Sequence, residues 1–170
     1  MQALRNTAQV HGYEPRILSN VEEVNLKQKK VLANKVVGRF GSNLNGLTFG
    51  IWGLSFKPET DDVREATSLV VITSLIDSGA KIKTYDPEAM MEFKRTIEDK
   101  YLDSIEFCKN RYDAVENCDA LILITEWKEF RNPDFELLSD KLNEKVIFDG
   151  RNIYDKKISN LGFELFQIGC

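Results

Sequence analysis

A long loop with two cationic side chains follows the first predicted strand. Residues 47–52 form a short apolar run, and residues 53–68 lead from it into the next predicted helix. Connections between a strand and a helix usually need only about 2–6 residues. Lys57 and Arg64 lie just ahead of that helix, where free backbone N–H groups and the helix dipole favour phosphate. This loop is therefore a candidate phosphate site, with Phe56 as an aromatic neighbour of Lys57.

A second interpretation of the same loop is a network of surface charges. Arg64 could form an ion pair with an acidic neighbour, and these neighbours are Asp61, Asp62 and Glu65. The loop also lacks the glycine spacing of a dinucleotide-binding fingerprint and of a P-loop. The residues alone leave a phosphate site and a surface ion pair as alternatives.

Arg151 directly follows another predicted strand, at residues 145–149. The carboxyl ends of parallel strands meet at one edge of a sheet, and ligands bind at that edge. Arg151 could therefore join Lys57 as a ligand for an anion. Alternatively, Asp149 and Gly150 form an ordinary turn that leaves Arg151 exposed.

Two further loops carry aromatic and acidic candidates. Trp127 and Phe130 follow the apolar run at residues 120–124 and could line a pocket for a base or a sugar. Packing in the core is the commoner use of such side chains. Asp86 follows the predicted strand at residues 81–85, where dinucleotide-binding folds place a carboxylate that holds a ribose. Without a glycine fingerprint, that role has little support for Asp86.

Strands that alternate with helices position these loops. The predicted strands are residues 47–52, 81–85, 104–107, 120–124, 145–149 and 163–167, and the predicted helices between them are residues 66–77, 88–99, 111–116 and 134–142. This alternation is typical of βαβ units with right-handed crossovers. We therefore expect an α/β fold, a Rossmann-like doubly wound sheet of about six mostly parallel strands.

The first part of the chain contains helix signals only. A short helical stretch at residues 2–11 precedes a long amphipathic helix at residues 16–40, whose apolar residues recur at steps of three, four and seven. A helix of this length must bury its apolar stripe, either on its own domain or in a dimer interface. We divide the chain into a helical segment, residues 1–44, and an α/β domain, residues 45–170.

Composition excludes several classes of protein. The 170 residues carry a formal net charge of -4, which argues against a nucleic acid or an anionic membrane surface as the main partner. No window approaches the ~18 apolar residues of a membrane span, and the first residues lack the pattern of a secretory signal. Cys108, Cys118 and Cys170 are far apart and His11 is the sole histidine, so we expect no metal site. Reduced thiols are typical of a cytoplasmic protein.

Several loops share a pattern with known enzymes. Residues 53–68 read Gly-Leu-Ser-Phe-Lys-Pro-Glu-Thr-Asp-Asp-Val-Arg-Glu-Ala-Thr-Ser, residues 125–130 read Thr-Glu-Trp-Lys-Glu-Phe, and residues 149–152 read Asp-Gly-Arg-Asn. In type and order, these segments resemble the UDP-binding C-terminal domain of the nucleotide-sugar 6-dehydrogenases, the UDP-glucose/GDP-mannose dehydrogenase family. Residues 12–18 and 24–29 are similar to the central linking helix of that family. The resemblance covers essentially the whole chain, and the first segment is its most specific part.

The resemblance implies roles for four residues. Phe56, Lys57 and Arg151 match family positions that contact the UDP-sugar, and Arg64 matches the arginine that reaches NAD. NAD itself is held mainly by another domain in this family, and the long helix forms the core of a homodimer. The members most similar to this chain oxidise UDP-glucose to UDP-glucuronate in two NAD-dependent steps through a covalent intermediate on a cysteine.

The chain departs from the family in what it lacks. The glycine fingerprint and the nucleophilic cysteine of the family lie upstream of the matching region, and none of the three cysteines here matches the nucleophile. We therefore expect the C-terminal part of such a dehydrogenase, without a catalytic residue of its own and inactive alone. The alternatives are a non-catalytic nucleotide-binding or dimerisation module, or the same part of a UDP-N-acetylmannosamine or GDP-mannose dehydrogenase.

Overall fold

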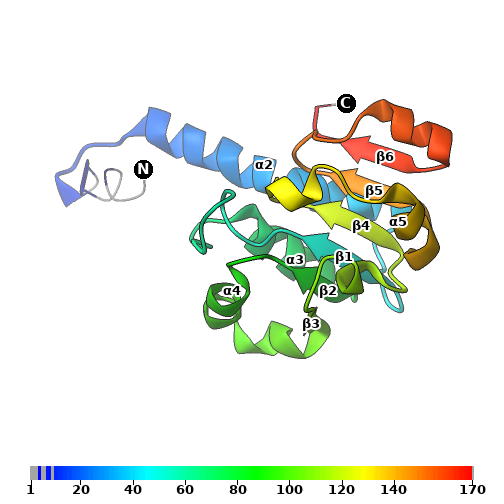
Figure 1. The fold of residues 1–170 in the computed structure, drawn as a ribbon. Coiled ribbons are helices and arrows are strands. Elements are labelled where there is room, and N and C mark those ends of the chain that lie inside the picture. Colours follow the sequence, from blue (N-terminus) through cyan, green and yellow to red (C-terminus); the bar gives the residue numbers. More distant parts are fainter. Residues whose placement is uncertain (1–3, 5–6, 9, 170) are drawn as a thin grey trace.

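A six-stranded parallel sheet forms the centre of the molecule in the computed structural model, which describes residue 4, residues 7–8 and residues 10–169 (Figure 1). The strands are β1 (Thr48–Trp52), β2 (Lys81–Tyr85), β3 (Ile105–Phe107), β4 (Ala120–Leu123), β5 (Val146–Asp149) and β6 (Glu164–Gln167). Their order across the sheet is β3-β2-β1-β4-β5-β6, and all five pairings are parallel. The predicted Rossmann-like, doubly wound α/β fold is confirmed, with a sheet that is entirely rather than mostly parallel.

Helices cover both faces of this sheet, and the central strands are therefore buried on both sides. One face carries α2 (Arg16–Phe40), α3 (Thr67–Asp77), α4 (Met90–Thr96) and η1 (Asp99–Ser104), and the other carries η2 (Asp113–Val115), η3 (Lys128–Phe130), α5 (Phe135–Lys141) and η4 (Lys156–Leu161). Alternate residues of each strand enter the two cores. In β4, for example, Ile122 packs on the side of α2 and α3, whereas Leu121 and Leu123 pack on the side of α5.

The long helix α2 has the predicted bounds and two different halves. Its C-terminal half buries Leu32, Ala33 and Val36 in the core, so this half packs on its own domain. Its N-terminal half projects away from the sheet and exposes Ile17 and Val24 (Figure 1). The apolar stripe that the sequence predicts as one surface is therefore only half covered.

Two predicted helices are shorter than expected. The helix predicted at residues 88–99 ends as α4 at Thr96, because Ile97 is extended, and a separate turn of 3₁₀-helix, η1, follows. The break allows both Ile97 and Tyr101 to be buried. The helix predicted at residues 111–116 is only the 3₁₀ turn η2.

The N-terminal prediction can be compared with the structure only in part. Much of the helical stretch predicted at residues 2–11 lies outside the described residues, and those that are described before His11 are helical. None of the helices in the described part of the chain combines the length and apolar character that a membrane crossing requires.

Candidate functional site

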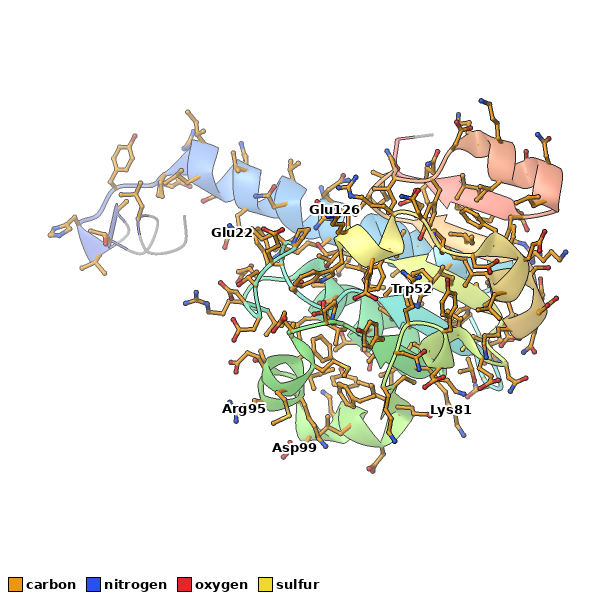
Figure 2. The ribbon with its side chains drawn as sticks, viewed as in Figure 1. Glu22, Trp52, Lys81, Arg95, Asp99 and Glu126 are labelled. Carbon is orange, nitrogen blue, oxygen red and sulfur yellow. The ribbon has the colours of Figure 1, made fainter. Side chains whose placement is uncertain are left out.

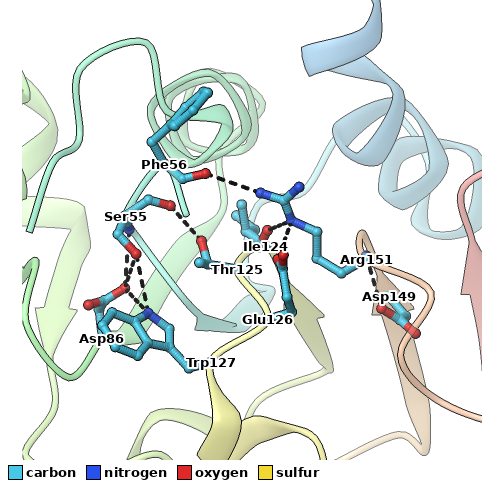
Figure 3. A network of polar contacts seen from close by, with 9 residues as sticks. All are labelled: Ser55, Phe56, Asp86, Ile124, Thr125, Glu126, Trp127, Asp149 and Arg151. Atoms are coloured by element: carbon cyan, nitrogen blue, oxygen red, sulfur yellow. Dashed lines mark hydrogen bonds and ion pairs between the residues drawn. The ribbon is translucent and has the colours of Figure 1, made fainter. Parts of the chain in front are cut away.

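Three loops meet at the carboxyl edge of the sheet, and Arg151 connects them (Figure 3). These loops follow β1, β4 and β5, which are neighbours in the sheet. Arg151 Nε donates a hydrogen bond to the carbonyl oxygen of Ile124 at 2.7 Å, and Nη2 donates to the carbonyl oxygen of Phe56 at 3.3 Å. Thr125 Oγ1 donates to the carbonyl oxygen of Ser55 at 2.6 Å, which fastens the β4 loop to the β1 loop. The expected convergence of Arg151 with the loop of Lys57 is confirmed.

The guanidinium of Arg151 is held by charge as well as by carbonyl groups. Glu126 Oε2 lies 2.9 Å from Arg151 Nε in an ion pair, and both side chains are only partly exposed. This oxygen is buried without a hydrogen-bond partner among the described residues, so the pair relies on charge rather than on good hydrogen-bond geometry. Asp149 Oδ1 accepts the backbone N–H of Arg151 at 3.0 Å. Arg151 does lie exposed in a turn after Asp149, as the alternative has it, but its guanidinium is also held by contacts with the neighbouring loops.

A buried carboxylate, Asp86, lies beneath the loop that carries Phe56 and Lys57. Its Oδ2 accepts hydrogen bonds from the backbone N–H groups of Leu54 (2.7 Å) and Ser55 (3.1 Å) and from Ser55 Oγ (3.2 Å). The indole Nε1 of Trp127 donates to the same oxygen at 3.0 Å, and Oδ1 accepts two backbone N–H groups of the turn after β2. Asp86 therefore binds the protein's own donors and is not placed to hold a ribose.

Trp127 and Phe130 belong to the core rather than to a pocket for a base. Phe130 is fully buried and stacks on Trp52 with ring centroids 5.1 Å apart. Trp127 is 8% exposed, and its indole N–H is used by Asp86 and Ser55. Of the two alternatives that the sequence leaves open, core packing is the one observed.

Arg64 lies in the same loop as Phe56 but makes an ion pair of its own. Its Nε and Nη2 donate to the two carboxylate oxygens of Asp62 at 2.9 and 2.8 Å, and its backbone N–H donates to the same group. Hydrogen bonding to Arg64 holds the pKa of Asp62 at about 2, below its usual value of 3.8. The Arg64 side chain is 86% exposed. The surface ion pair that the sequence offers as an alternative is therefore present.

A cavity of about 570 Å³ lies between α2 and the carboxyl edge of the sheet. Phe56 and Arg151 line it on the sheet side, and Lys29 of α2 lines it on the other. The other lining residues are Glu22, Asn25, Leu26, Gln28, Leu32, Glu65, Thr67, Ile124, Gly150 and Ile168. Neither Lys57 nor Arg64 lines this cavity, although Lys57 is exposed next to Phe56. The structure thus brings together two of the four predicted site residues.

The cavity contains charges of both signs. Arg151 and Lys29 are its cations, and Lys29 Nζ lies 2.7 Å from a carboxylate oxygen of Glu65. Figure 2 shows Glu22 and Glu126 on the side of the molecule where α2 passes the sheet, and Lys81, the first residue of β2, on the far side. An anion that enters the cavity therefore meets cations on both walls and must compete with carboxylates that already pair with them.

The thiols in the described part of the chain are poorly suited to act as nucleophiles. Cys108 and Cys118 are buried, and burial raises the pKa of Cys108 to about 11 and that of Cys118 to about 12. Cys170 lies outside the described residues. Among those residues, no group of three or more His, Cys, Asp or Glu side chains is placed to hold a metal ion.

Sequence reasoning missed three parts of this site. Lys29 is one of several lysines on the polar face of α2, and nothing in that pattern distinguishes it. Glu126 is visible only as part of a family segment, and for Asp86 the sequence offers only a ribose contact with little support. The position of Asp86 at the end of β2 was the one usable signal, since side chains at strand ends point into the loops of neighbouring strands.

Most of the sheet and its loops match a known family of proteins. Residues 50–156 match the model of the UDP-glucose/GDP-mannose dehydrogenase family, UDP binding domain. A UDP-glucose 6-dehydrogenase of Pseudomonas aeruginosa is 37% identical over 175 residues, which covers 99% of this chain and 38% of that protein. A UDP-glucose 6-dehydrogenase of Rhizobium meliloti is 36% identical and covers 98% of this chain and 37% of that protein. The chain thus spans less than two fifths of the length of these relatives.

The fold has a close counterpart among solved structures. A UDP-glucose dehydrogenase from the hyperthermophilic archaeon Pyrobaculum islandicum superimposes with a TM-score of 0.76 at 27% identity. The match covers 97% of this chain and 34% of that one. A UDP-D-ManNAc dehydrogenase from Pyrococcus horikoshii, at 23% identity and a TM-score of 0.65, shares the fold.

Proposed function

Because the chain belongs to the UDP-glucose/GDP-mannose dehydrogenase family and matches its UDP-binding domain, we propose that it binds the UDP part of a nucleotide sugar at the cavity beside Arg151. Arg151 supplies a cation for the diphosphate within the cavity, Lys57 supplies a second cation from outside it, next to Phe56, and Phe56 packs against the ligand. UDP-glucose is the substrate most consistent with the relatives, which are UDP-glucose 6-dehydrogenases.

One observation carries this proposal. The hydrogen bond from Arg151 Nη2 to the carbonyl oxygen of Phe56 joins the two loops that hold all three proposed ligand contacts. The Nε edge of the guanidinium is occupied by Ile124 and Glu126, so the group is fixed before a ligand arrives. A cation that is already oriented loses less conformational entropy when it binds a diphosphate than a free side chain does.

Arg64 is proposed to contact NAD rather than the UDP-sugar. The family consists of NAD-dependent dehydrogenases, and NAD supplies the hydride acceptor of such enzymes. Arg64 fits a contact with a phosphate-bearing cofactor on a neighbouring domain, because it is exposed and lies outside the cavity. Its ion pair with Asp62 must open or be shared for that contact. The remainder of the NAD site is proposed to lie in the part of the enzyme to which this chain does not align.

Oxidation of UDP-glucose to UDP-glucuronate is proposed for the complete enzyme and not for this chain alone. The raised pKa values of Cys108 and Cys118 support this division, because a thiol with such a pKa is almost fully protonated near pH 7. We expect no NADH when the chain is incubated with UDP-glucose and NAD. Appreciable NADH formation would overturn the proposal that this chain lacks the catalytic group.

A homodimer through α2 is proposed as a second role of the chain, in keeping with a division into a helical segment, residues 1–44, and a UDP-binding domain, residues 45–170. The exposed apolar residues of the N-terminal half of α2 favour it, since Ile17 is 80% and Val24 is 63% exposed. Sedimentation equilibrium tests it: Val24→Asp should dissociate the dimer, and Lys30→Asp on the polar face should not. A wild-type chain that remains monomeric at high concentration contradicts the proposal.

Calorimetric titration tests the binding proposal. We expect UDP to bind the wild-type chain more tightly than uridine, because the diphosphate meets Arg151 and Lys57. Arg151→Ala should remove most of that preference, about tenfold or more in affinity. Arg131→Ala is the matched control, because Arg131 is exposed and lies outside the cavity. Absence of UDP binding at millimolar concentration, or an equal effect of both substitutions, would refute the site.

A further inference from the structure

Asp86 bridges two of the loops that line the cavity, those after β1 and β4, and the turn after β2, although it does not line the cavity itself. Asp86 directly follows the last residue of β2. It is one of the buried polar residues of the described chain, with 1% of its surface exposed. Through Oδ2 it accepts hydrogen bonds from the N–H groups of Leu54 and Ser55 and from the indole of Trp127. Figure 3 shows the contacts from Ser55 and Trp127. One carboxylate thus connects the β1 loop, the β2 turn and the β4 loop.

We propose that Asp86 is a positioning residue, whose carboxylate fixes the β1 loop and the β4 loop so that Phe56, Lys57 and Arg151 face one anion. The inference rests on the proposed function for the identity of that anion, the diphosphate of a UDP-sugar. Asp86 acts through other residues, since its oxygens are already occupied by the protein's own donors.

The chemistry of a carboxylate explains why this position needs one. An ionised carboxylate accepts hydrogen bonds at both oxygens and donates none. Six donors converge on Asp86, four on Oδ2 and two on Oδ1. An asparagine has the same shape, but its amide nitrogen would face donors on one side or the other. Those buried N–H groups would lose their acceptor and become costly to bury.

The connection from Asp86 to Phe56 and Lys57 is short. Leu54 and Ser55, which donate to Asp86, are the two residues directly before Phe56. The carbonyl oxygen of Leu54 accepts a hydrogen bond from Ser68 Oγ at 2.5 Å, which ties the same segment to the first turn of α3. With both sides of its backbone fixed, this segment has little freedom to move, and the direction in which the chain continues into Phe56 is fixed with it.

The connection to Arg151 runs through the β4 loop. Trp127 donates to Asp86, and the residue before it, Glu126, pairs with Arg151 Nε. Thr125 fixes the same loop to Ser55 from the other side. A loss of the acceptor at Asp86 therefore loosens Glu126 and Arg151 together with Phe56.

A test without ligand uses Asp86→Asn and a matched control, Asp119→Asn. Asp119 also accepts hydrogen bonds from the sheet, from the N–H of Thr48 at 2.8 Å and from Asn143 Nδ2 at 3.0 Å, but at the amino edge. Hydrogen exchange of the amides at residues 53–57 and 124–127 should speed up about tenfold or more in Asp86→Asn, because Leu54, Ser55 and the Trp127 indole lose their acceptor and both loops open more often. Asp119→Asn should leave both segments unchanged. Unchanged exchange in Asp86→Asn would overturn the positioning role.

A test with ligand measures UDP affinity by calorimetry. We expect the Kd for UDP to rise about tenfold in Asp86→Asn and less than about twofold in Asp119→Asn. A core variant with a similar loss of thermal stability, such as Ile147→Ala, should keep its UDP affinity, which a purely structural role of Asp86 would not predict. Equal UDP affinity of Asp86→Asn and wild type overturns the inference. Absence of UDP binding by the wild type overturns the proposed function instead, and hydrogen exchange still decides the role of Asp86.

A milder variant covers the case in which Asp86→Asn does not fold. Trp127→Phe removes a single donor to Asp86 and keeps an aromatic ring in the core. It should speed exchange at residues 53–57 and raise the Kd for UDP about threefold. If exchange and affinity both stay at the wild-type values, the bridge through Asp86 does not position the site.

Discussion

Arg151 and Arg64 lie in loops at the same edge of the sheet, but the two guanidinium groups are held in opposite ways. Arg151 donates to carbonyl oxygens of two other loops and pairs with Glu126. Arg64 pairs within its own loop, with Asp62 two residues earlier, and its side chain is 86% exposed. The position of Arg151 therefore depends on the tertiary structure, whereas that of Arg64 is a local feature of the chain.

The difference indicates what each arginine is suited to bind. A guanidinium held by three separate groups presents its remaining edge in a fixed direction, as a site within one domain requires. An exposed ion pair contributes little to stability and opens at small cost, as a contact with a neighbouring domain requires. This contrast agrees with the proposed division between a UDP site at Arg151 and an NAD contact at Arg64.

The largest expected effect comes from a substitution at Gly53, where the β1 loop passes close to the β4 loop. A Cβ at Gly53 would lie 2.6 Å from Thr125, whose loop carries the partners of Arg151, and the φ angle of Gly53 is 92°. Gly53→Ala should lower the free energy of unfolding by about 3 kcal/mol in urea titrations, from steric overlap and backbone strain. Gly41→Ala is the control, because Gly41 has the same φ of 92° and nothing within 4 Å. An equal loss at both positions would show that packing against Thr125 does not matter.

Removal of Lys57 tests whether the exposed cation beside Phe56 acts together with Arg151. Lys57→Ala should weaken UDP binding about fivefold at low salt, because one cation near the diphosphate is lost. Glu59→Ala changes an exposed charge of the opposite sign in the same loop and should not weaken binding. Equal affinities of the two variants in calorimetry would remove Lys57 from the site.

The carboxylate that pairs with Arg151 should compete with the ligand. In Glu126→Gln the negative charge beside Arg151 is lost, while the hydrogen bond from Nε to the carbonyl oxygen of Ile124 remains. We expect UDP to bind about threefold more tightly, since an anion no longer shares the guanidinium. Weaker binding would mean that Glu126 mainly orients Arg151. A titration at several salt concentrations separates charge from orientation.

The smallest effect on UDP binding is expected at Arg64. Arg64→Ala should change the Kd for UDP less than about 1.5-fold, because its guanidinium lies outside the cavity and its charge is already paired with Asp62. The same substitution should raise the pKa of Asp62 from about 2 towards 3.8, which carboxyl chemical shifts would report. A large loss of UDP affinity would show that Arg64 also belongs to the UDP site, which contradicts the proposed division between the two arginines.

The pH dependence of the Arg64 pair has a definite sign. The pKa of Asp62 in the folded chain, about 2, lies below its ordinary value of 3.8. The pair therefore stabilises the fold fully above about pH 4, and this contribution is lost as the pH falls towards 2. In Arg64→Ala, the free energy of unfolding should therefore fall less between about pH 4 and pH 2 than it does in the wild type.

Periodicity was sufficient for the architecture of this chain. Parallel strands that are buried on both faces read as continuous apolar runs, and residues 120–124 and 145–149 predicted β4 and β5 within one residue. The helix at residues 16–40 was predicted with the bounds of α2, since apolar residues recur along one face of it at helical spacing. Short helices were predicted less well. The helix predicted at residues 88–99 is broken at Ile97, which is buried in an extended conformation, and the separate helix η1 follows with Tyr101 buried.

Residue types along the chain also identified the loops that carry the candidate site, because charged and aromatic residues at strand ends have a definite location in a parallel sheet. They did not show which charges meet. Asp62 lies two residues from Arg64, so that pair could be anticipated as a local alternative. Glu126 and Arg151 are far apart in sequence, and no local signal connects them.

The sequence by itself thus determined the parallel sheet, the long helix and the edge at which we propose that a ligand binds, because these depend on short-range periodicity and on strand direction. The tertiary structure decided that Asp86 serves the protein's own loops, that Trp127 is a core residue and that Lys29 of α2 faces the cavity. It also decided which of the two arginines is fixed in place. Contacts across loops depend on the order of strands in the sheet, which brings β1, β4 and β5 together although they are separated in the chain.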